Sequence, residues 1–204
     1  MTLPRSSTEN APPEAASAMP WWQKGWADNL KVLAIALVVA LTLRFWVVEP
    51  RYIPSGSMEP TLQVGDRIAV EKVSYRFWQP QRGDIVVFYP PGETDRQRAY
   101  IKRIVGLPGD RLQIQNGRVY ANGEPLPEPY LAEPIQYTLV VPDGEGAATL
   151  TVPANAYWVM GDNRNNSNDS HVWGYLPRRN LIGRAVFRFY PPERFGPLPR
   201  PAYP

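Results

Sequence analysis

The hydrophobic pattern divides the chain into a helical segment followed by a long region of alternating strands. From Val32 to Val48 every residue is apolar except Thr42 and Arg44. At about 1.5 Å per residue this run covers roughly 25 Å, slightly less than a hydrocarbon layer of about 30 Å. The tryptophan-rich stretch 21–26 that precedes it is typical of a membrane interface. We therefore predict an interfacial segment and a transmembrane anchor over residues 21–48.

Two other structures would share this apolar pattern: a buried core helix and the apolar part of a signal peptide. A cleaved signal peptide is disfavoured, because the run begins well inside the chain and residues 44–50 offer no small-x-small cleavage site. Basic residues lie on both sides of the run, so the positive-inside rule barely decides an orientation.

Beyond Pro50 the apolar positions alternate with a period of two, which predicts β-strands. Asn-Gly pairs at 116–117 and 122–123 predict tight hairpin turns around a short strand. The sequence therefore predicts a mainly β fold, with an antiparallel β domain over residues 49–190 and one N-terminal transmembrane helix. The strands are expected at 67–73, 84–89, 100–105, 111–115, 118–120, 137–141, 149–152, 156–160 and 182–190.

The two ends of the chain differ from this domain in composition. Residues 1–20 are rich in Pro, Ser, Ala and Glu without an apolar period, which predicts a disordered, mobile tail. Residues 191–204 are rich in proline, which predicts an extended C-terminal tail.

Composition narrows the chemistry that the domain can perform. The chain has 22 Lys and Arg against 19 Asp and Glu, without a basic run, so a nucleic-acid partner is not expected. It has no cysteine and one histidine, His171, which excludes thiol nucleophiles, disulfides and multi-histidine metal sites. We expect no metal and no other cofactor. Hydrolytic chemistry would have to use hydroxyls, carboxylates, lysines or His171.

One turn is suited to present a hydroxyl group. In the stretch 53–62 two prolines bracket Gly56, which lies between Ser55 and Ser57. The prolines bar regular helix, while the glycine permits dihedrals that other residues resist. Such a turn can hold a serine hydroxyl rigidly, although composition alone favours a polar surface loop.

A serine becomes a good nucleophile only when a base takes its proton, and a lysine is a base only when it is neutral. Neutrality requires burial, because a free lysine has a pKa of about 10.4. Lys102 shares its predicted strand face with Tyr100 and Ile104, so it is a candidate. Lys72 passes the same test on its own strand, and either lysine could instead snorkel at a strand edge.

The stretch 161–171 is dense in short polar side chains and is a third candidate. Ser167 would hydrogen-bond to the lysine amine and orient it. Alternatively, His171 and Asp169 would form a Ser-His-Asp triad with Ser57. The stretch also fits an Asx-rich surface loop with no catalytic part.

In these segments the chain resembles the type I signal peptidases, the membrane-bound Ser/Lys proteases. Four stretches match in order, and with the anchor the likeness runs from about residue 32 to 190. The resemblance implies that Ser57 attacks the scissile carbonyl and that Lys102, not Lys72, is the general base. The matching stretches are 55–62, 82–88, 100–110 and 161–170.

The resemblance also implies the roles of the surrounding residues. The Ser57 backbone N–H and the Ser55 hydroxyl would form the oxyanion hole, and Ser167 would fix the lysine amine. Shallow apolar pockets would admit only small side chains before the cut, and the substrate would add as a strand to an exposed edge. The residues that match these substrate pockets are Ile53, Met58, Val87 and Ile101.

By this resemblance the chain is a single-pass membrane endopeptidase that removes signal peptides from exported preproteins. Its partners would be preproteins and the lipid bilayer, near the export translocon. The catalytic domain would lie outside the cytoplasm, on the periplasmic side of the cell membrane, with a thylakoid membrane as the alternative. Two departures stand out: His171 replaces an arginine found in many bacterial members, and the second β region is small.

The resemblance leaves two rival functions to test. One is a Ser-His-Asp hydrolase that uses His171. The other is a non-catalytic, membrane-tethered β module that binds peptides by strand addition.

Overall fold

The computed structural model describes residues 21–42, 47–92, 98–139 and 149–203. The chain divides into two compact units, Met1–Leu41 and Thr42–Pro204. The predicted N-terminal tail, residues 1–20, lies outside the described residues, as does most of the loop predicted between the strands at 137–141 and 149–152.

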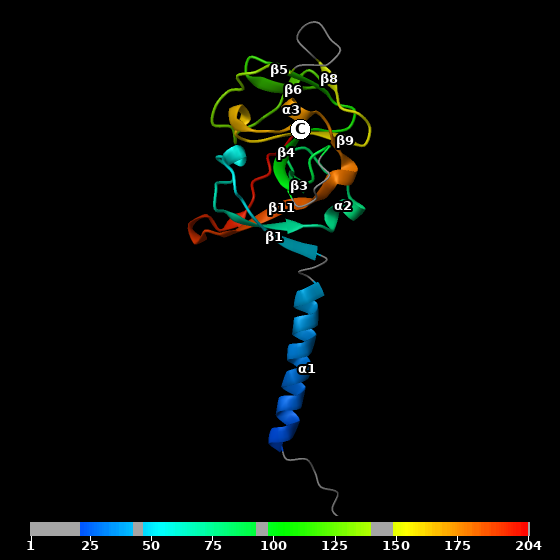
Figure 1. Cartoon of the computed structure of the whole chain (residues 1–204), viewed down its shortest axis with the longest axis vertical. Coiled ribbons are helices and arrows are strands. Elements are labelled where there is room, and N and C mark those ends of the chain that lie inside the picture. The colour runs from blue at the N-terminus through cyan, green and yellow to red at the C-terminus, as the bar shows by residue number, and fades with distance from the viewer. Residues whose placement is uncertain (1–20, 43–46, 93–97, 140–148, 204) are drawn as a thin grey trace, which may run out of the picture. The chain divides into compact units, whose positions relative to one another are not determined.

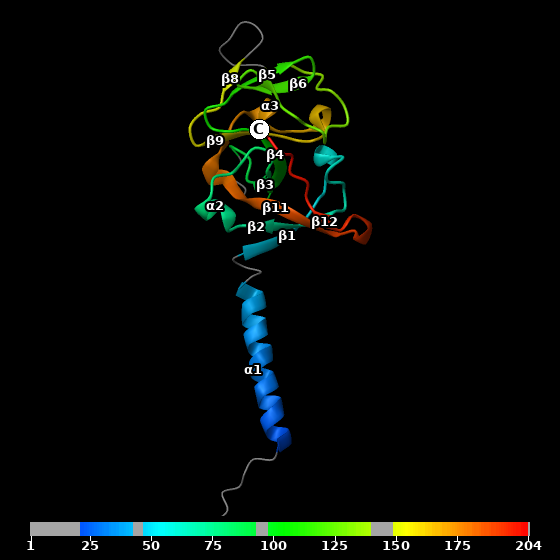
Figure 2. The same cartoon turned by 180° about the vertical axis from the view of Figure 1, so that it is seen from behind.

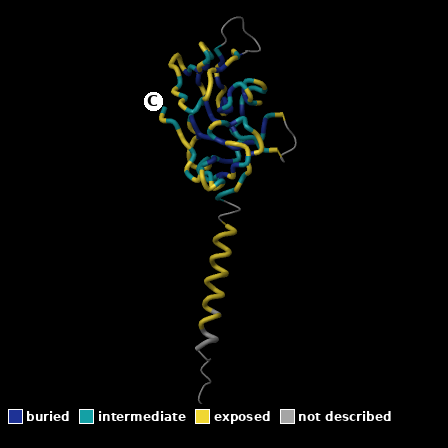
Figure 3. The backbone as a smooth tube through the Cα atoms, turned by 90° about the vertical axis from the view of Figure 1, so that its left-hand side faces the viewer, coloured by how far each residue is buried: buried dark blue, intermediate teal, exposed yellow. Residues whose placement is uncertain are grey.

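The first unit contains helix α1 (Trp21–Thr42), whose leucines, alanines and lysines are good helix formers. Each residue of this helix whose burial is described is exposed (Figure 3). The predicted apolar span extends past this helix into residues 43–46, outside the described part, and its last residue begins strand β1 (Val48–Tyr52). Within the described residues, no helix combines the length and apolar character needed to cross a membrane.

The second unit is built on a large antiparallel sheet, as predicted. Its strands follow the order β1-β2-β11-β3-β4-β9-β10. Strand β12 pairs with Phe187 and Arg188 of β11. Figures 1 and 2 show this sheet curling around the interior of the domain. The strands not yet bounded are β2 (Arg67–Glu71), β3 (Ile85–Phe88), β4 (Tyr100–Gly106), β9 (Ala156–Met160), β10 (Leu176–Pro177), β11 (Leu181–Tyr190) and β12 (Gly196–Pro197).

A smaller antiparallel sheet, in the order β7-β6-β5-β8, lies at the end of the domain away from β1 (Figures 1 and 2). Both predicted Asn-Gly turns are present, with positive φ at Asn116 and Asn122. These turns fix the register of β6 against its neighbours. The strands are β5 (Arg111–Gln115), β6 (Arg118–Ala121), β7 (Glu124–Pro125) and β8 (Leu150–Thr151).

One predicted strand is wrong. Residues 137–139 are irregular, and 140–141 lie outside the described residues. The apolar residues there serve packing rather than a ladder: the Tyr137 ring stacks on His171 at 4.3 Å, and Leu139 is buried in the core under the smaller sheet. Alternation over so short a stretch does not distinguish these two arrangements.

Short helical turns connect the strands and bring the polar segments together. Three of them are central to the site: η2 (Gly56–Met58) carries the serine turn, while η3 (Arg164–Asn166) and α3 (Ser170–Trp173) lie in the polar loop. The others are α2 (Ser74–Phe77), η4 (Arg178–Asn180) and η5 (Pro192–Arg194).

Strand β4 is fixed in the interior by a buried ion pair. The guanidinium of Arg103 binds both carboxylate oxygens of Asp162 at 2.8 and 2.6 Å, and both side chains are fully buried. The same guanidinium donates to the carbonyls of Gly83 and Pro199. The proline-rich C-terminal segment, predicted only as a tail, thus packs on the residue next to Lys102.

Candidate active site

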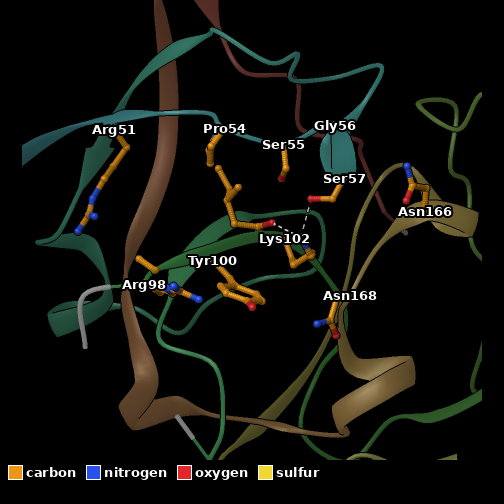
Figure 4. Close-up of a pocket in the computed structure, with 12 residues that line it drawn as sticks. Arg51, Pro54, Ser55, Gly56, Ser57, Arg98, Tyr100, Lys102, Asn166 and Asn168 are labelled. Carbon is orange, nitrogen blue, oxygen red and sulfur yellow. Dashed lines mark hydrogen bonds between the residues drawn. The ribbon is translucent and has the colours of Figure 1, made fainter. Parts of the chain in front are cut away.

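The serine turn is held by its backbone and by two buried apolar side chains. Ser55 is extended before the single turn of η2, and the Glu59 N–H donates to the Gly56 carbonyl at 3.0 Å. Met58 and Leu62 are fully buried, which anchors the turn in the core. Ser57 therefore lies on a rigid bend with its hydroxyl toward β4 (Figure 4).

The hydroxyl of Ser57 meets the amine of Lys102. Lys102 lies on β4 opposite Val86, and its Nζ is 2.7 Å from Ser57 Oγ and 2.9 Å from the Ile101 carbonyl oxygen. Only 4% of the lysine is exposed. Burial lowers the pKa of Lys102 to about 8, although Asp169 and Asp162 oppose the shift. Near neutral pH the amine is therefore still mostly protonated, but it has a far larger neutral fraction than an ordinary lysine and can act as a base in that form.

The other candidate lysine has a different setting. Lys72 Nζ lies 3.5 Å from a carboxylate oxygen of Glu49, and its side chain is 23% exposed. The Ser57 hydroxyl contacts Lys102 instead, so Lys72 is not placed to take its proton.

The lowered pKa of Lys102 predicts how activity depends on pH. The amine accepts a proton only in its neutral form, and the neutral fraction grows as pH rises through about 8. We expect kcat/KM to rise through this pH and then level off. A rate profile over roughly pH 6 to 10, with a peptide that does not titrate there, tests this. A midpoint near the ordinary lysine value would contradict it.

The polar loop, residues 161–171, is hydrogen-bonded to the backbone of the serine turn. The Asn163 backbone N–H donates to the Ser57 carbonyl at 3.1 Å, and its side-chain amide donates to the Gly56 carbonyl at 3.2 Å. In a trans peptide the N–H points away from the carbonyl. Because the Gly56 carbonyl faces Asn163, the Ser57 N–H points to the opposite side of the turn.

Asp169 organises this loop as a buried acceptor. It accepts from the Gly161 N–H at 2.8 Å and from the Ser167 hydroxyl at 2.5 Å. The Ser167 hydroxyl thus donates to Asp169, and among the described residues the hydrogen-bond partners of the Lys102 amine are Ser57 and Ile101. Ser167 lies near the pair without a hydrogen bond to the amine.

Gly161 begins the candidate stretch 161–171, and it has a packing role that the sequence did not reveal. A Cβ added there would lie 2.3 Å from Ser167 Oγ and 2.4 Å from the Ser57 carbonyl oxygen. Only glycine lets the loop approach the serine turn so closely. In sequence, the only sign of this role is a glycine at the start of an Asx-rich stretch, where a simple turn explains it equally well.

Asp169 and His171 of the alternative triad contact each other, but the Ser57 hydroxyl is bonded to Lys102. His171 Nδ1 lies 2.8 Å from Asp169 Oδ1, and its ring stacks on Tyr137. Among the described residues, the hydrogen-bond partner of the Ser57 hydroxyl is Lys102. The arrangement gives His171 a structural role in holding Asp169.

A cleft of about 590 Å³ opens beside the Ser57–Lys102 pair (Figure 4). Of the four residues predicted to form substrate pockets, Ile101 lines it. Ile53, Met58 and Val87 belong to the core cluster against which Ile101 packs. Other lining residues were not predicted as site residues: Arg51, Pro54, Arg98, Ala99, Tyr100, Asn166 and Asn168.

One edge of β4 is unpaired along this cleft. Residues Tyr100 to Lys102 pair with β3 on one side, whereas the ladder with β9 begins only at Arg103. Among the described strands, this stretch therefore has a partner on one edge alone. A free edge beside the reactive pair can accept the backbone of an extended peptide.

The described part of the chain contains no group of three or more His, Asp or Glu placed to hold a metal ion. The groups that line the cleft include the Ser57 hydroxyl and the Lys102 amine.

Comparison with known proteins shows the family to which the chain belongs. The family model for signal peptidases, peptidase S26, matches residues 26–190. A probable signal peptidase I-1 of Synechocystis sp. is 54% identical over 176 residues, covering 84% of this chain and 86% of that protein. A signal peptidase I of Leptolyngbya laminosa is 47% identical, covering 97% of each chain. Thylakoidal processing peptidase 1 of Arabidopsis thaliana is 38% identical, covering 82% of this chain and 49% of that protein.

Proposed function

Because the chain belongs to the signal peptidase family, peptidase S26, and is a serine peptidase, we propose that it cleaves signal peptides from preproteins with a Ser57–Lys102 pair. The observation that carries this proposal is the 2.7 Å contact between Lys102 Nζ and Ser57 Oγ at a buried amine. A nucleophile within hydrogen-bond reach of a neutral base is the arrangement that acyl transfer requires.

In the first half of the reaction, Ser57 Oγ attacks the scissile carbonyl carbon while the Lys102 amine takes the hydroxyl proton. The resulting ammonium then gives this proton to the nitrogen of the leaving peptide, and an acyl-enzyme remains. One N–H of the Lys102 amine donates a hydrogen bond to the Ile101 carbonyl at 2.9 Å. This bond would orient the amine so that its lone pair points toward Ser57.

In the second half, the neutral amine takes a proton from a water that attacks the acyl carbon. The proton then returns to Ser57 Oγ and the signal peptide leaves. The burial that lowers the pKa of Lys102 allows one group to alternate between base and acid near neutral pH.

We assign the oxyanion hole to the Ser57 backbone N–H and the Ser55 hydroxyl. The orientation of the Gly56–Ser57 peptide, with its carbonyl held by Asn163, supports the first assignment. Ser55 supports the second, because it is exposed and lines the cleft next to Ser57. These donors would stabilise charge that develops only in the transition state.

The substrate would bind as an added strand along the free edge of β4. Ile101 and the core residues behind it leave little depth at this position, which supports a preference for small side chains before the cut. Ser167 would act through Asp169, which holds the loop against the serine turn.

We further propose that residues 21–48 anchor the chain in a membrane, with the β domain on the side where signal peptides emerge. The long apolar run and the thylakoidal relative support this. An anchor would raise the local concentration of a membrane-inserted substrate. Alkaline extraction of membranes carrying the full chain tests it, since release into the soluble fraction would contradict an anchor.

The function is tested by incubating the purified full chain in detergent with a preprotein and sequencing the N-terminus of the shortened product. The wild type is expected to cut after a small residue at the end of the signal peptide, and Ser57→Ala to show no cleavage. Absence of cleavage by the wild type would overturn the proposal. An unchanged activity in Ser57→Ala would indicate that another protein cuts the substrate.

The His171→Ala variant separates the proposal from a Ser-His-Asp mechanism. Because His171 bonds to Asp169 and the Ser57 hydroxyl bonds to Lys102, we expect this variant to retain cleavage. Complete loss of cleavage in a folded His171→Ala protein, together with activity in Lys102→Ala, would favour the triad.

A further inference from the structure

The cleft carries an excess of positive charge at its far end from the serine. Of the described residues that line it, Arg51, Arg98 and Lys102 are basic and none is acidic. Figure 4 draws Arg51 and Arg98 on one side of the pocket, and Asn166 and Asn168 on the other. Lys102 contacts Ser57, so the basic side chains away from the serine are the two arginines.

The two arginines come from different segments of the chain. Arg51 belongs to β1 and pairs with Ile68 of β2, while Arg98 lies just before β4, on the segment that forms the free edge. They are 47 positions apart in sequence, so neither charge reveals the other in the amino-acid pattern.

Local pairing leaves part of this charge uncompensated. Glu49 lies 2.5 Å from Arg51 and also binds Lys72 at 3.5 Å, so one carboxylate is shared by two cations. Arg98 is exposed and has no ion-pair partner among the described residues. Counting the described lining residues, an anionic group that enters the cleft therefore meets net positive charge on a path that leads to Ser57.

On the basis of the proposed function, we propose that Arg51 and Arg98 form a specificity subsite for an acidic side chain of the substrate. Arg98 precedes Lys102 by four residues, which is about 13 Å along a strand. Ile101, which faces small side chains before the cut, lies between them in the chain. The subsite thus falls on the amino side of the scissile bond, about four to six residues before it.

The test compares substrates that differ only in Glu or Gln at the fourth, fifth or sixth residue before the cut. For the wild type, kcat/KM is expected to favour Glu at one of these positions by about three- to tenfold. The ratio is expected to approach one in Arg98→Gln and in the Arg51→Gln/Arg98→Gln double variant. It is also expected to fall with added salt, because partly exposed charges are screened.

A matched control removes an equal charge elsewhere. Arg118 is exposed on β6 in the smaller sheet and does not line the cleft, so Arg118→Gln is expected to keep the wild-type Glu/Gln ratio. The single Arg98→Gln variant keeps the test valid if loss of the Arg51–Glu49 pair disturbs β1.

Three results would overturn the subsite. The first is a Glu/Gln ratio of one at all three positions in an active wild-type enzyme, and the second is a ratio that persists in the double variant. The third is an effect of the arginine variants that appears only with vesicles containing anionic lipid and is equal for both substrates, which would assign the arginines to the membrane surface. Loss of all cleavage by the wild type would instead contradict the proposed function.

Discussion

Replacing Lys102 with methionine is expected to lower kcat/KM for a signal-peptide substrate by roughly 10⁴-fold or more. Methionine has similar length and suits the buried setting, but it has no lone pair to take the proton of Ser57. Steady-state cleavage of a peptide with a fluorescent donor and quencher measures the loss. Because a buried amine is costly to desolvate, its removal is not expected to lower the melting temperature.

The Lys102→Arg variant is the control for charge. Arginine keeps a cation at this position but stays protonated, so it cannot serve as a base at any pH used in the assay. We expect it to be as inactive as the methionine variant. Substantial cleavage by either protein, with Ser57→Ala inactive, would show that another group takes the serine proton.

Replacing Ser55 with alanine is expected to lower kcat by about 10²- to 10³-fold, the loss typical of one oxyanion donor. The hydroxyl would bond the oxyanion, which exists only in the transition state, so KM is expected to change little. Ser55 is exposed and caps no backbone group of η2, so the fold is expected to stay intact. Separate determination of kcat and KM with one peptide checks this.

The Ser55→Thr and Ser74→Ala variants are the controls for the Ser55→Ala measurement. Threonine retains the hydroxyl and is expected to recover part of the rate. Ser74 begins helix α2, outside the cleft, and its alanine variant is expected to behave as wild type. A Ser55→Ala enzyme with unchanged kcat would remove this side chain from the oxyanion hole.

The strands could be predicted where burial against a core alone determines which positions are apolar. In β5 and β9 the predicted and observed bounds coincide. In these strands the apolar residues face a core, so alternation or an apolar run reports burial directly. The strand predicted at 137–141 was wrong, because Tyr137 packs on the ring of His171 and not on a sheet.

The burial of Lys102 was also within reach of the sequence, because Tyr100 and Ile104 share its strand face. Alternation could not separate it from Lys72, since both lie in line with apolar neighbours. The difference is an ion pair: Lys72 is close to Glu49, a residue on the adjacent strand, whereas Lys102 meets an uncharged hydroxyl.

The supports of the serine turn were beyond sequence reasoning because they come from distant residues. Asn163 bonds the Gly56 carbonyl across 107 positions, and Gly161 makes room for the same turn. A polar residue in a loop has many local partners available, so its sequence neighbourhood does not reveal a remote one. The arginines of the cleft were missed because they are 47 positions apart, so neither indicates the other.

The free edge of β4 has a further consequence for the behaviour of the protein in solution. Unpaired edges attract one another, and this is a common route to aggregation of sheet proteins. Here the open stretch is only three residues long, Pro54 in the same cleft lacks an N–H, and Arg98 stands at its end. So short an edge offers little pairing surface to a second sheet, while it remains open to a single extended peptide.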